Sequence, residues 1–480
     1  MEDFRKKVLN ASKWSAITEI LAKCITPVTS MILARILAPE AFGILATVQM
    51  IIAFAQVFVD FGFQKFLIQH EFRDDLEEKQ YMSVALIANV FVGMVLWLLL
   101  IIFNKPIAIC VGDAGKGYLL AITGVTIPVY GIIGIQNCKL RKDLNFKKLF
   151  YVRMVSALVP LFITIPLALL GLDYWSLIIG NIAGVFINSI MLVLLKSFKP
   201  IKYFSFTDLK RMLDYGVWTL LNGIAVWLTS WVDAFLIGRY MTDYYLGLYK
   251  NSSSTITSIF AMVTSAITPV LFSSLSKVQN DNDEFSGLYI NILKVLSMFL
   301  LPVGIGVFLY QDFVTDILLG SKWSEASRII GITSLMTAVR TIYISLNGDV
   351  FRAKGYFKIP LFLQVAELII TIPSCIWGLS RGFWDFIYIR ALSKVILIPV
   401  EIALLSLQCN VKFKAIVKSS WMYYFSSALM TVAAIFLKKF SSGSLWSILS
   451  IGVCAVCYFA VLLCIPNERN LIYKYIKKEK

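Results

Sequence analysis

The sequence predicts an all-α membrane protein with about 14 transmembrane helices. Hydrophobic residues make up 58% of the chain and charged residues only 15%, whereas soluble domains carry more charge and less apolar surface. The mean hydropathy of +0.77 also indicates a membrane protein. Apolar runs of the length that a bilayer core demands recur from one end of the chain to the other.

These apolar runs define 14 predicted spans joined by short connections. With boundaries accurate to a few residues, their limits are 14–37, 42–65, 81–103, 117–137, 150–171, 174–195, 213–238, 248–272, 288–310, 328–347, 359–379, 384–407, 416–437 and 444–465. The connections leave no room outside the membrane for a folded catalytic domain. We therefore expect no enzyme activity, no catalytic residue, no metal site and no cofactor. The chain also lacks a GxxxxGK[ST] phosphate loop, which argues against ATP-driven pumping.

The net charge of +16 is distributed as membrane topology requires. With the N-terminus placed inside, 31 of the 45 Lys and Arg residues lie in inner segments and 11 in outer connections. This bias predicts that both termini are cytoplasmic. The basic tail, Arg469–Lys480, is expected to lie on anionic membrane lipids. The sequence shows no basic surface interleaved with aromatic residues of the kind that binds nucleic acid, so we expect no nucleic-acid partner.

An internal repeat divides the chain. Arg35 and Gly43 enclose a segment whose echo lies between Arg239 and Gly247, 204 residues later, and both copies join two spans on the outer side. Two copies in the same orientation are one plan of membrane transporters. The predicted parts are an N-terminal lobe of helices 1–6, a C-terminal lobe of helices 7–12, and helices 13–14 with the basic tail, at residues 1–200, 201–408 and 409–480.

Several segments resemble a known family. They are Ala34–Leu45, Asp60–Phe63 and Leu67–Gln69 in the first copy, and Asp233–Arg239 and Leu246–Tyr249 in the second. Together they are similar to the polysaccharide-export branch (Wzx-type oligosaccharide flippases) of the multidrug/oligosaccharidyl-lipid/polysaccharide flippase superfamily. The resemblance covers the full chain.

The resemblance implies a flippase that carries an undecaprenyl-diphosphate-linked oligosaccharide across the bacterial inner membrane, for surface polysaccharides such as lipopolysaccharide. In this family two lobes enclose a central cavity and alternate access by rocking. The implied partners are the anionic lipid-linked oligosaccharide, membrane lipids and other polysaccharide assembly proteins. The alternative is an ion-coupled exporter of drugs or small molecules on a related fold, for which we expect an acidic, aromatic cavity.

Cations within spans are candidates for substrate binding. A charge at the bilayer centre costs about 2.5–3.5 kcal/mol on insertion scales, so each needs a reason. Lys23, Arg340 and Lys394 are the predicted contacts of the substrate diphosphate. For Lys23, an ion pair with Glu19 one turn earlier is an equal alternative.

Arg35 and Arg239 are related by the repeat and are predicted at the outer mouth of the cavity. They are further candidate substrate contacts. Anchoring of helix ends beside the interface is the alternative.

Acidic residues within spans are candidates for coupling transport to a proton or sodium gradient. Asp233 and Glu367 are the predicted coupling residues, Asp233 because it lies in the motif of the second copy. Structural ion pairing with Arg340 or Lys394 is the competing interpretation. For Asp60, near the inner end of the second span, capping or packing is expected.

Overall fold

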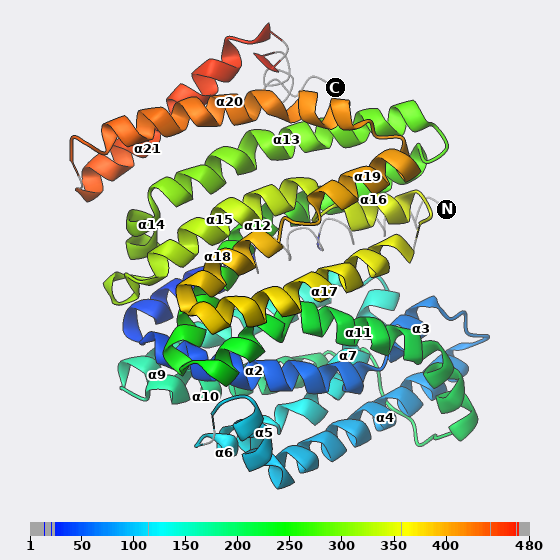
Figure 1. Ribbon diagram of the computed structural model, residues 1–480. Helices are drawn as coiled ribbons and strands as arrows, with labels where there is room; N and C mark the ends of the chain where they lie inside the picture. Colours follow the sequence, from blue (N-terminus) through cyan, green and yellow to red (C-terminus); the bar gives the residue numbers. More distant parts are fainter. Residues whose placement is uncertain are drawn as a thin grey trace. The chain divides into compact units, whose positions relative to one another are not determined.

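The computed structural model describes Trp14, Leu21 and residues 25–113, 115–356, 358–441, 443–466 and 468–469 (Figure 1). These residues form helices joined by turns, with no β-strand among them. The chain divides into two compact units, residues 1–251 and 252–480, which are described separately. The division falls inside a helix, and the lobe boundaries at residues 200 and 408 stay a prediction.

After Trp14 and Leu21, the described residues of the first unit continue with a short apolar helix, Ile25–Ile36. It is followed by α2 (Pro39–Asp60), α3 (Phe63–Gln69), α4 (Asp75–Ile102), α5 (Asn104–Cys110), α6 (Gly117–Thr123), α7 (Thr126–Lys142), α8 (Phe146–Val159), the π-helical turn η1 (Pro160–Thr164), α9 (Ile165–Leu169), α10 (Asp173–Leu194) and α11 (Phe206–Tyr240). The long helix α12 (Asp243–Lys277) continues into the second unit.

The second unit continues with ten further elements. They are α13 (Asn282–Leu309), α14 (Gln311–Leu318), the 3-10 turn η2 (Ser321–Trp323), α15 (Ala326–Tyr343), α16 (Asn347–Ala353), α17 (Lys358–Arg381), α18 (Phe383–Ser393), α19 (Ile398–Cys409), α20 (Phe413–Leu437) and α21 (Ser444–Leu463).

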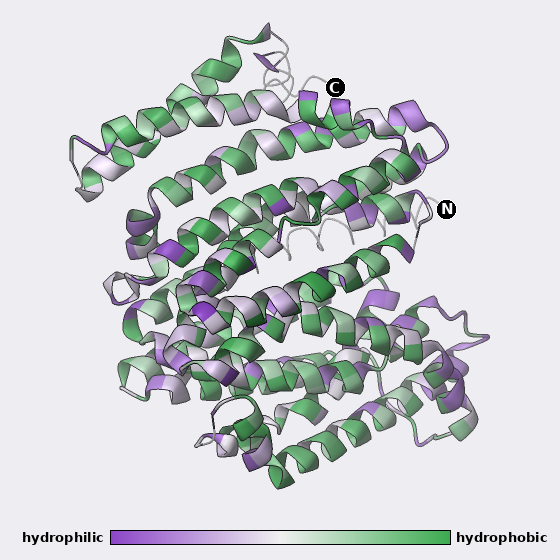
Figure 2. Cartoon of the chain, in the orientation of Figure 1, coloured by the Kyte–Doolittle hydropathy of each residue, from purple (hydrophilic) through white to green (hydrophobic). Residues whose placement is uncertain are grey.

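The predicted fold class is confirmed. Within the described residues, 12 helices are long and apolar enough to cross a membrane, several of them built from two adjoining segments. Figure 2 shows hydrophobic residues along these helices and hydrophilic residues gathered at connections such as the one between α3 and α4. The number 14 stays a prediction, because the first predicted span lies partly outside the described residues and α12 is not among the 12.

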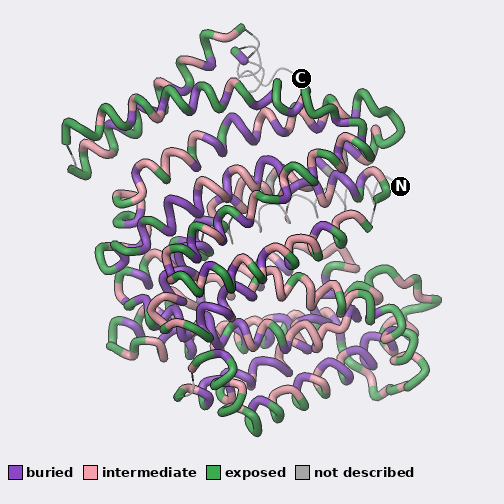
Figure 3. Tube along the Cα trace, viewed as in Figure 1, coloured by how far each residue is buried: buried purple, intermediate pink, exposed green. Residues whose placement is uncertain are grey.

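Large apolar side chains remain exposed on the outer faces of the helices. On α4, for example, Phe91 is 66% exposed and Ile102 is 64% exposed. Figure 3 shows exposed and buried positions along the same helices throughout each unit. Exposed apolar faces of this extent are expected where helices contact lipid.

In the first unit, α2 and α7 are the central helices. Each packs against α4 and α10 and against the other, and α2 also packs against α11. Apolar residues of α2, including Ile44, Val48 and Ile52, form a common core with Ile127 of α7 and Ile178 of α10. The polar positions of α2 and α7 are therefore held at fixed places inside the unit.

In the second unit, α13 lies between α15 and α20, and α20 packs against α21 (Figure 1). Two crossings of this unit are broken. One is interrupted between α15 and α16, and the other between α18 and α19. Broken helices release backbone carbonyl groups that need a polar partner, and in transporters they often mark binding sites.

The repeated motif forms a reciprocal contact. A Cβ atom at Gly43 would collide with the backbone carbonyl of Asp243, and a Cβ atom at Gly247 would collide with the carbonyl of Pro39. Gly43 and Gly247 differ by the repeat offset of 204, as do Pro39 and Asp243. The beginnings of α2 and α12 therefore cross at backbone contact, in the way expected of two related copies.

This crossing yields a stability prediction. Gly43→Ala and Gly247→Ala should each destabilise the fold by about 1–3 kcal/mol, because a methyl group has no space there. The measurement is thermal unfolding of the detergent-purified protein. Gly287→Ala in α13 is the control, because its Cβ atom would meet nothing within 4 Å. Equal melting temperatures for all three variants would contradict the contact.

Candidate functional site

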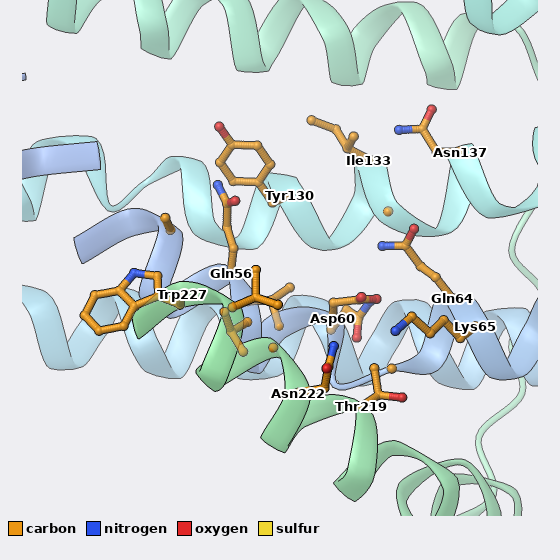
Figure 4. A pocket seen from close by; sticks show the side chains of 18 of the residues that line it. Gln56, Asp60, Gln64, Lys65, Tyr130, Ile133, Asn137, Thr219, Asn222 and Trp227 are labelled. Carbon is orange, nitrogen blue, oxygen red and sulfur yellow. The ribbon is translucent and has the colours of Figure 1, made fainter. Parts of the chain in front are cut away.

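A polar cavity of about 510 Å³ lies within the first unit (Figure 4). Its walls come from α2, α3, α7 and α11, and Asn89 of α4 also reaches it. Because each wall belongs to a helix packed in the core of the unit, the cavity is formed by the fold itself and not by a surface loop.

The chemistry of the walls is mainly that of amides, hydroxyls and aromatic rings. Of the described residues that line the cavity, only Asp60 and Lys65 carry a charge. The uncharged polar and aromatic residues are Gln56, Gln64, Asn89, Asn137, Asn222, Thr219, Ser230, Tyr130, Trp227 and Trp231. Amides both donate and accept hydrogen bonds, so this lining suits an uncharged ligand rich in polar groups.

The break between α2 and α3 places the two charges. Phe61 and Gly62 adopt left-handed backbone angles, with φ of 37° and 81°, and these end α2 at Asp60. A Cβ atom on Gly62 would lie 2.7 Å from the Cβ atom of Thr219, so α11 approaches the break closely. Asp60 and Lys65 therefore lie on the two sides of the break and both face the cavity (Figure 4).

Two acceptor atoms in the wall lack a partner. Oδ1 of Asp60 and Oδ1 of Asn89 are buried and accept no hydrogen bond from the described residues, and Asn89 is only 1% exposed. An unsatisfied buried acceptor costs about 1–3 kcal/mol. A ligand or water that donates hydrogen bonds would recover this cost, and hydroxyl groups are suitable donors.

The tryptophan side chains that line the cavity are held in place by polar contacts. Trp227 donates from Nε1 to the carbonyl of Met50 on α2, at 3.0 Å. The ammonium of Lys250 lies 3.8 Å from the ring centroid of Trp231, and its Nζ donates to the carbonyl of Ser230. These contacts fix the orientation of two ring systems that could stack against a ligand.

A second polar cavity, of about 380 Å³, lies beyond α7 in the same unit. Tyr130 and Ile133 of α7 line both cavities, so they form the partition. In the second cavity Asn188 donates from Nδ2 to Oγ of Ser156 at 2.9 Å, while its Oδ1 has no partner among the described residues. The polar space therefore continues past α7 with the same chemistry.

In the second unit, Arg340 forms an ion pair with Glu367. The two guanidinium nitrogens donate to the two carboxylate oxygens at 2.8 and 3.0 Å, and Nη1 also donates to the carbonyl of Lys394 at 3.2 Å. That carbonyl lies where α18 is interrupted. Arg340 therefore satisfies a released carbonyl, and the ion pairing anticipated for Glu367 as the competing interpretation is present.

A second polar contact bridges the same breaks. Asn347, the first residue of α16, donates from Nδ2 to Oε2 of Glu401 at 2.6 Å and accepts from the hydroxyl of Tyr289. Asn347 and Glu401 are 1% and 4% exposed. Sequence reasoning missed Asn347, although an asparagine within an apolar run is a recognisable signal of internal polar packing.

The remaining predicted site residues lie in different places. Lys23 falls outside the described residues. Lys394 is half-buried at the end of α18. Arg35 and Arg239 are exposed, and Nη1 of Arg239 donates to the carbonyl of Ile109 at 2.5 Å. Within the first unit, neither arginine lines the two polar cavities.

Asp233 is buried in α11. Its Oδ1 accepts from the backbone N–H of Ala234, and its Oδ2 accepts from the hydroxyl of Tyr249 at 2.6 Å. Asp60, for which capping or packing was expected, accepts hydrogen bonds from the backbone and the side chain of Gln64 at the start of α3, and it also lines the larger cavity. Of the tail that was expected to contact lipid, residues 470–480 lie outside the described residues.

Comparison with known proteins identifies the family. Residues 32–328, more than half of the chain, match the family described as "Polysaccharide biosynthesis protein". The chain belongs to this polysaccharide biosynthesis family. The family that the motifs predicted is thereby confirmed, and the match spans both copies of the repeated motif.

Individual relatives and structures agree with this family. The lipopolysaccharide biosynthesis protein WzxC of Escherichia coli (strain K12) is 22% identical over 380 residues, which cover 78% of this chain and 75% of WzxC. The solved structure "Lipid II flippase MurJ, inward closed conformation" matches with a TM-score of 0.78 and 17% identity, over 96% of this chain and 99% of that one. An inward-facing multidrug resistance MATE family transporter matches with a TM-score of 0.62 and 13% identity, over 84% and 99%. At these identities the two structures show a shared fold.

The Arg340–Glu367 pair yields a prediction for this polysaccharide biosynthesis protein. Arg340→Ala should lower stability by about 1–3 kcal/mol, between the values for exposed and buried pairs, because it strands Glu367 and the Lys394 carbonyl. The double variant Arg340→Ala/Glu367→Ala should recover part of this loss. Thermal unfolding of the purified variants is the measurement.

The exposed pair of Arg352 and Asp349, at 2.8 Å, supplies the control. Arg352→Ala should change stability little, because the side chain of Arg352 is 50% exposed. If Arg340→Ala leaves stability unchanged and the double variant recovers nothing, the pair has no structural role, and the substrate-binding interpretation of Arg340 gains support.

Proposed function

We propose that this protein is a flippase that moves an undecaprenyl-diphosphate-linked oligosaccharide from the cytoplasmic to the outer leaflet of the bacterial inner membrane. It would work by alternating access and serve the synthesis of a surface polysaccharide, with both termini in the cytoplasm. One observation carries the proposal: a chain of this family holds an amide-rich cavity among helices apolar enough to cross a membrane.

The physical task is to move hydroxyl groups and a diphosphate through hydrocarbon. Each polar group that is buried without a hydrogen bond costs several kcal/mol, and an ion costs far more. The amides of the cavity can replace water around sugar hydroxyls, and Tyr130, Trp227 and Trp231 can cover apolar sugar faces. Such hydrogen bonds are individually weak, so the glycan can also leave.

The cations are assigned to the diphosphate. Lys65 lines the cavity and is exposed, and a phosphate group would compete with the nearby carboxylate of Asp60 for its ammonium. Four further cations remain proposed contacts of the diphosphate along its path across the membrane, namely Lys23, Arg35, Arg239 and Lys394. Arg340 is retained with the added requirement that the substrate compete with Glu367 for its guanidinium.

Transport is proposed to be coupled to a proton or sodium gradient through Asp233 or Glu367. Asp233 supports this because its carboxylate is buried and held by Tyr249 inside an apolar helix. Glu367 supports it because loss of its charge would release Arg340. Membrane lipids and other polysaccharide assembly proteins are the proposed partners.

The alternative of a multidrug exporter fits less well. The shared fold with a MATE family transporter speaks for it. A binding site for cationic drugs needs unbalanced acidic groups, however, and in the larger cavity the single carboxylate of Asp60 is accompanied by Lys65. The amide lining favours a hydroxyl-rich ligand.

Deletion of the gene tests the proposal. The deletion strain should accumulate one undecaprenyl-diphosphate-linked oligosaccharide and lose the matching surface polysaccharide, because the substrate stays on the inner face. Lipid extraction followed by mass spectrometry is the measurement. The deletion strain complemented with the Asn89→Leu variant should export roughly tenfold less surface polysaccharide than the strain complemented with wild type. This corresponds to one lost hydrogen bond of about 1.4 kcal/mol.

Asn104→Ala is the control for that variant, because Asn104 lies on α5 and lines neither polar cavity. It should restore export fully. A deletion strain that accumulates no lipid-linked oligosaccharide would count against flipping, whatever the result of complementation.

A further inference from the structure

An apolar groove of about 610 Å³ lies beside the polar cavity in the first unit. None of the residues that line it is polar, and six of them are phenylalanines, namely Phe58, Phe61, Phe63, Phe91, Phe204 and Phe206. Three of these rings are open to the surroundings, with Phe206 exposed by 79%, Phe91 by 66% and Phe204 by 43%.

The groove and the polar cavity share the same helices. At the junction of α2 and α3, Phe58, Phe61 and Phe63 line the groove, whereas Asp60 and Gly62 line the cavity. On α4 and α11 the lining also divides between the two spaces. Asn89 and Thr219 face the cavity, whereas Ala88, next to Asn89, and Leu213, six residues before Thr219, face the groove.

Phe61 and Gly62 form a wall between the two spaces, because Phe61 lines the groove and the adjoining Gly62 lines the cavity. On α11, Gly216 lies so close to Phe61 that a Cβ atom would collide with the Phe61 carbonyl. Both wall residues have positive φ angles, and Phe61 is not a glycine, so its conformation stores strain.

We infer that the groove binds the first part of the substrate's polyprenyl chain while the diphosphate and glycan occupy the polar cavity. The inference rests on the proposed function. An amphiphile with an apolar chain, a diphosphate and a glycan matches, in this order, a phenylalanine groove, Lys65 at the junction and an amide-lined cavity.

The headgroup distinguishes this occupant from ordinary lipid. Within a bilayer an apolar groove gains little from the hydrophobic effect, because lipid tails are as apolar as its walls. A chain tethered to a headgroup in the adjacent cavity is present at a high effective concentration. Occupancy by the substrate chain should therefore depend on its diphosphate.

Photo-crosslinking tests the inference. The full chain in phosphatidylglycerol nanodiscs is labelled with a polyprenyl diphosphate that carries a diazirine on its first isoprene units, and peptides are mapped by mass spectrometry. Labelling should concentrate on the groove, at Phe91 and Phe206, and unlabelled undecaprenyl diphosphate should reduce it at least fivefold. Labelling elsewhere, or labelling that added phosphatidylglycerol displaces equally well, would overturn the inference.

Two variants of one helix sharpen the test. Leu213→Trp fills the groove and should reduce the labelling at least fivefold. Val217→Trp, one turn further along α11, adds the same bulk at a residue that is 46% exposed and does not line the groove, and should label as wild type does. Equal labelling of both variants would contradict the groove.

If Leu213→Trp fails to fold, the wild-type competition still decides. The readout is also separate from the proposed function. Groove labelling that fails while the deletion strain accumulates a lipid-linked oligosaccharide would refute the groove alone. Labelling that succeeds without such accumulation would refute the flippase and leave a polyprenyl-diphosphate site.

Discussion

The backbone crossing between the beginnings of α2 and α12 is the contact on which the first unit depends. Gly43 and Gly247 allow it, because each lies against a backbone carbonyl of the other helix. Because only two residues separate α11 from α12, the crossing also holds α11 alongside α2. α11 then supplies Thr219, Asn222 and Trp227 to the polar cavity. The repeated motif therefore shapes the cavity indirectly, because the close backbone contact that it allows positions α11.

The charge distribution assigns different work to the two units. In the first, a largely uncharged cavity offers hydrogen bonds that are weak enough to exchange with water. In the second, Arg340 is balanced by Glu367, and the cluster closes the breaks of two helices. A dense group of free cations would hold a diphosphate tightly and slow its release, whereas transport needs reversible binding. An amide-rich site with a single lysine meets this requirement in the first unit.

Sequence was sufficient for the fold class and the family, because both depend on long-range patterns. Hydropathy gave the helices, and the spacing of Arg35 and Gly43 revealed the repeat. The site was beyond reach for a physical reason. Asn89 and Tyr130 lie within apolar runs, and nothing in one sequence says which face they present. The partners Arg340 and Glu367 are 27 residues apart and meet only through helix packing. Residues 394–397, where α18 is interrupted, contain neither proline nor glycine, and only Gly62 marks the break beside Phe61.

The proposed function requires that the cavity between α2, α7 and α11 receive the polar headgroup. Electron cryo-microscopy of the full chain in nanodiscs, with a purified undecaprenyl-diphosphate-linked oligosaccharide, is the measurement that shows where the headgroup binds. Sugar density beside Asn89 and Tyr130, with phosphate density near Lys65, is the predicted result. Sugar density elsewhere in the molecule, with this cavity holding only water, would contradict the account.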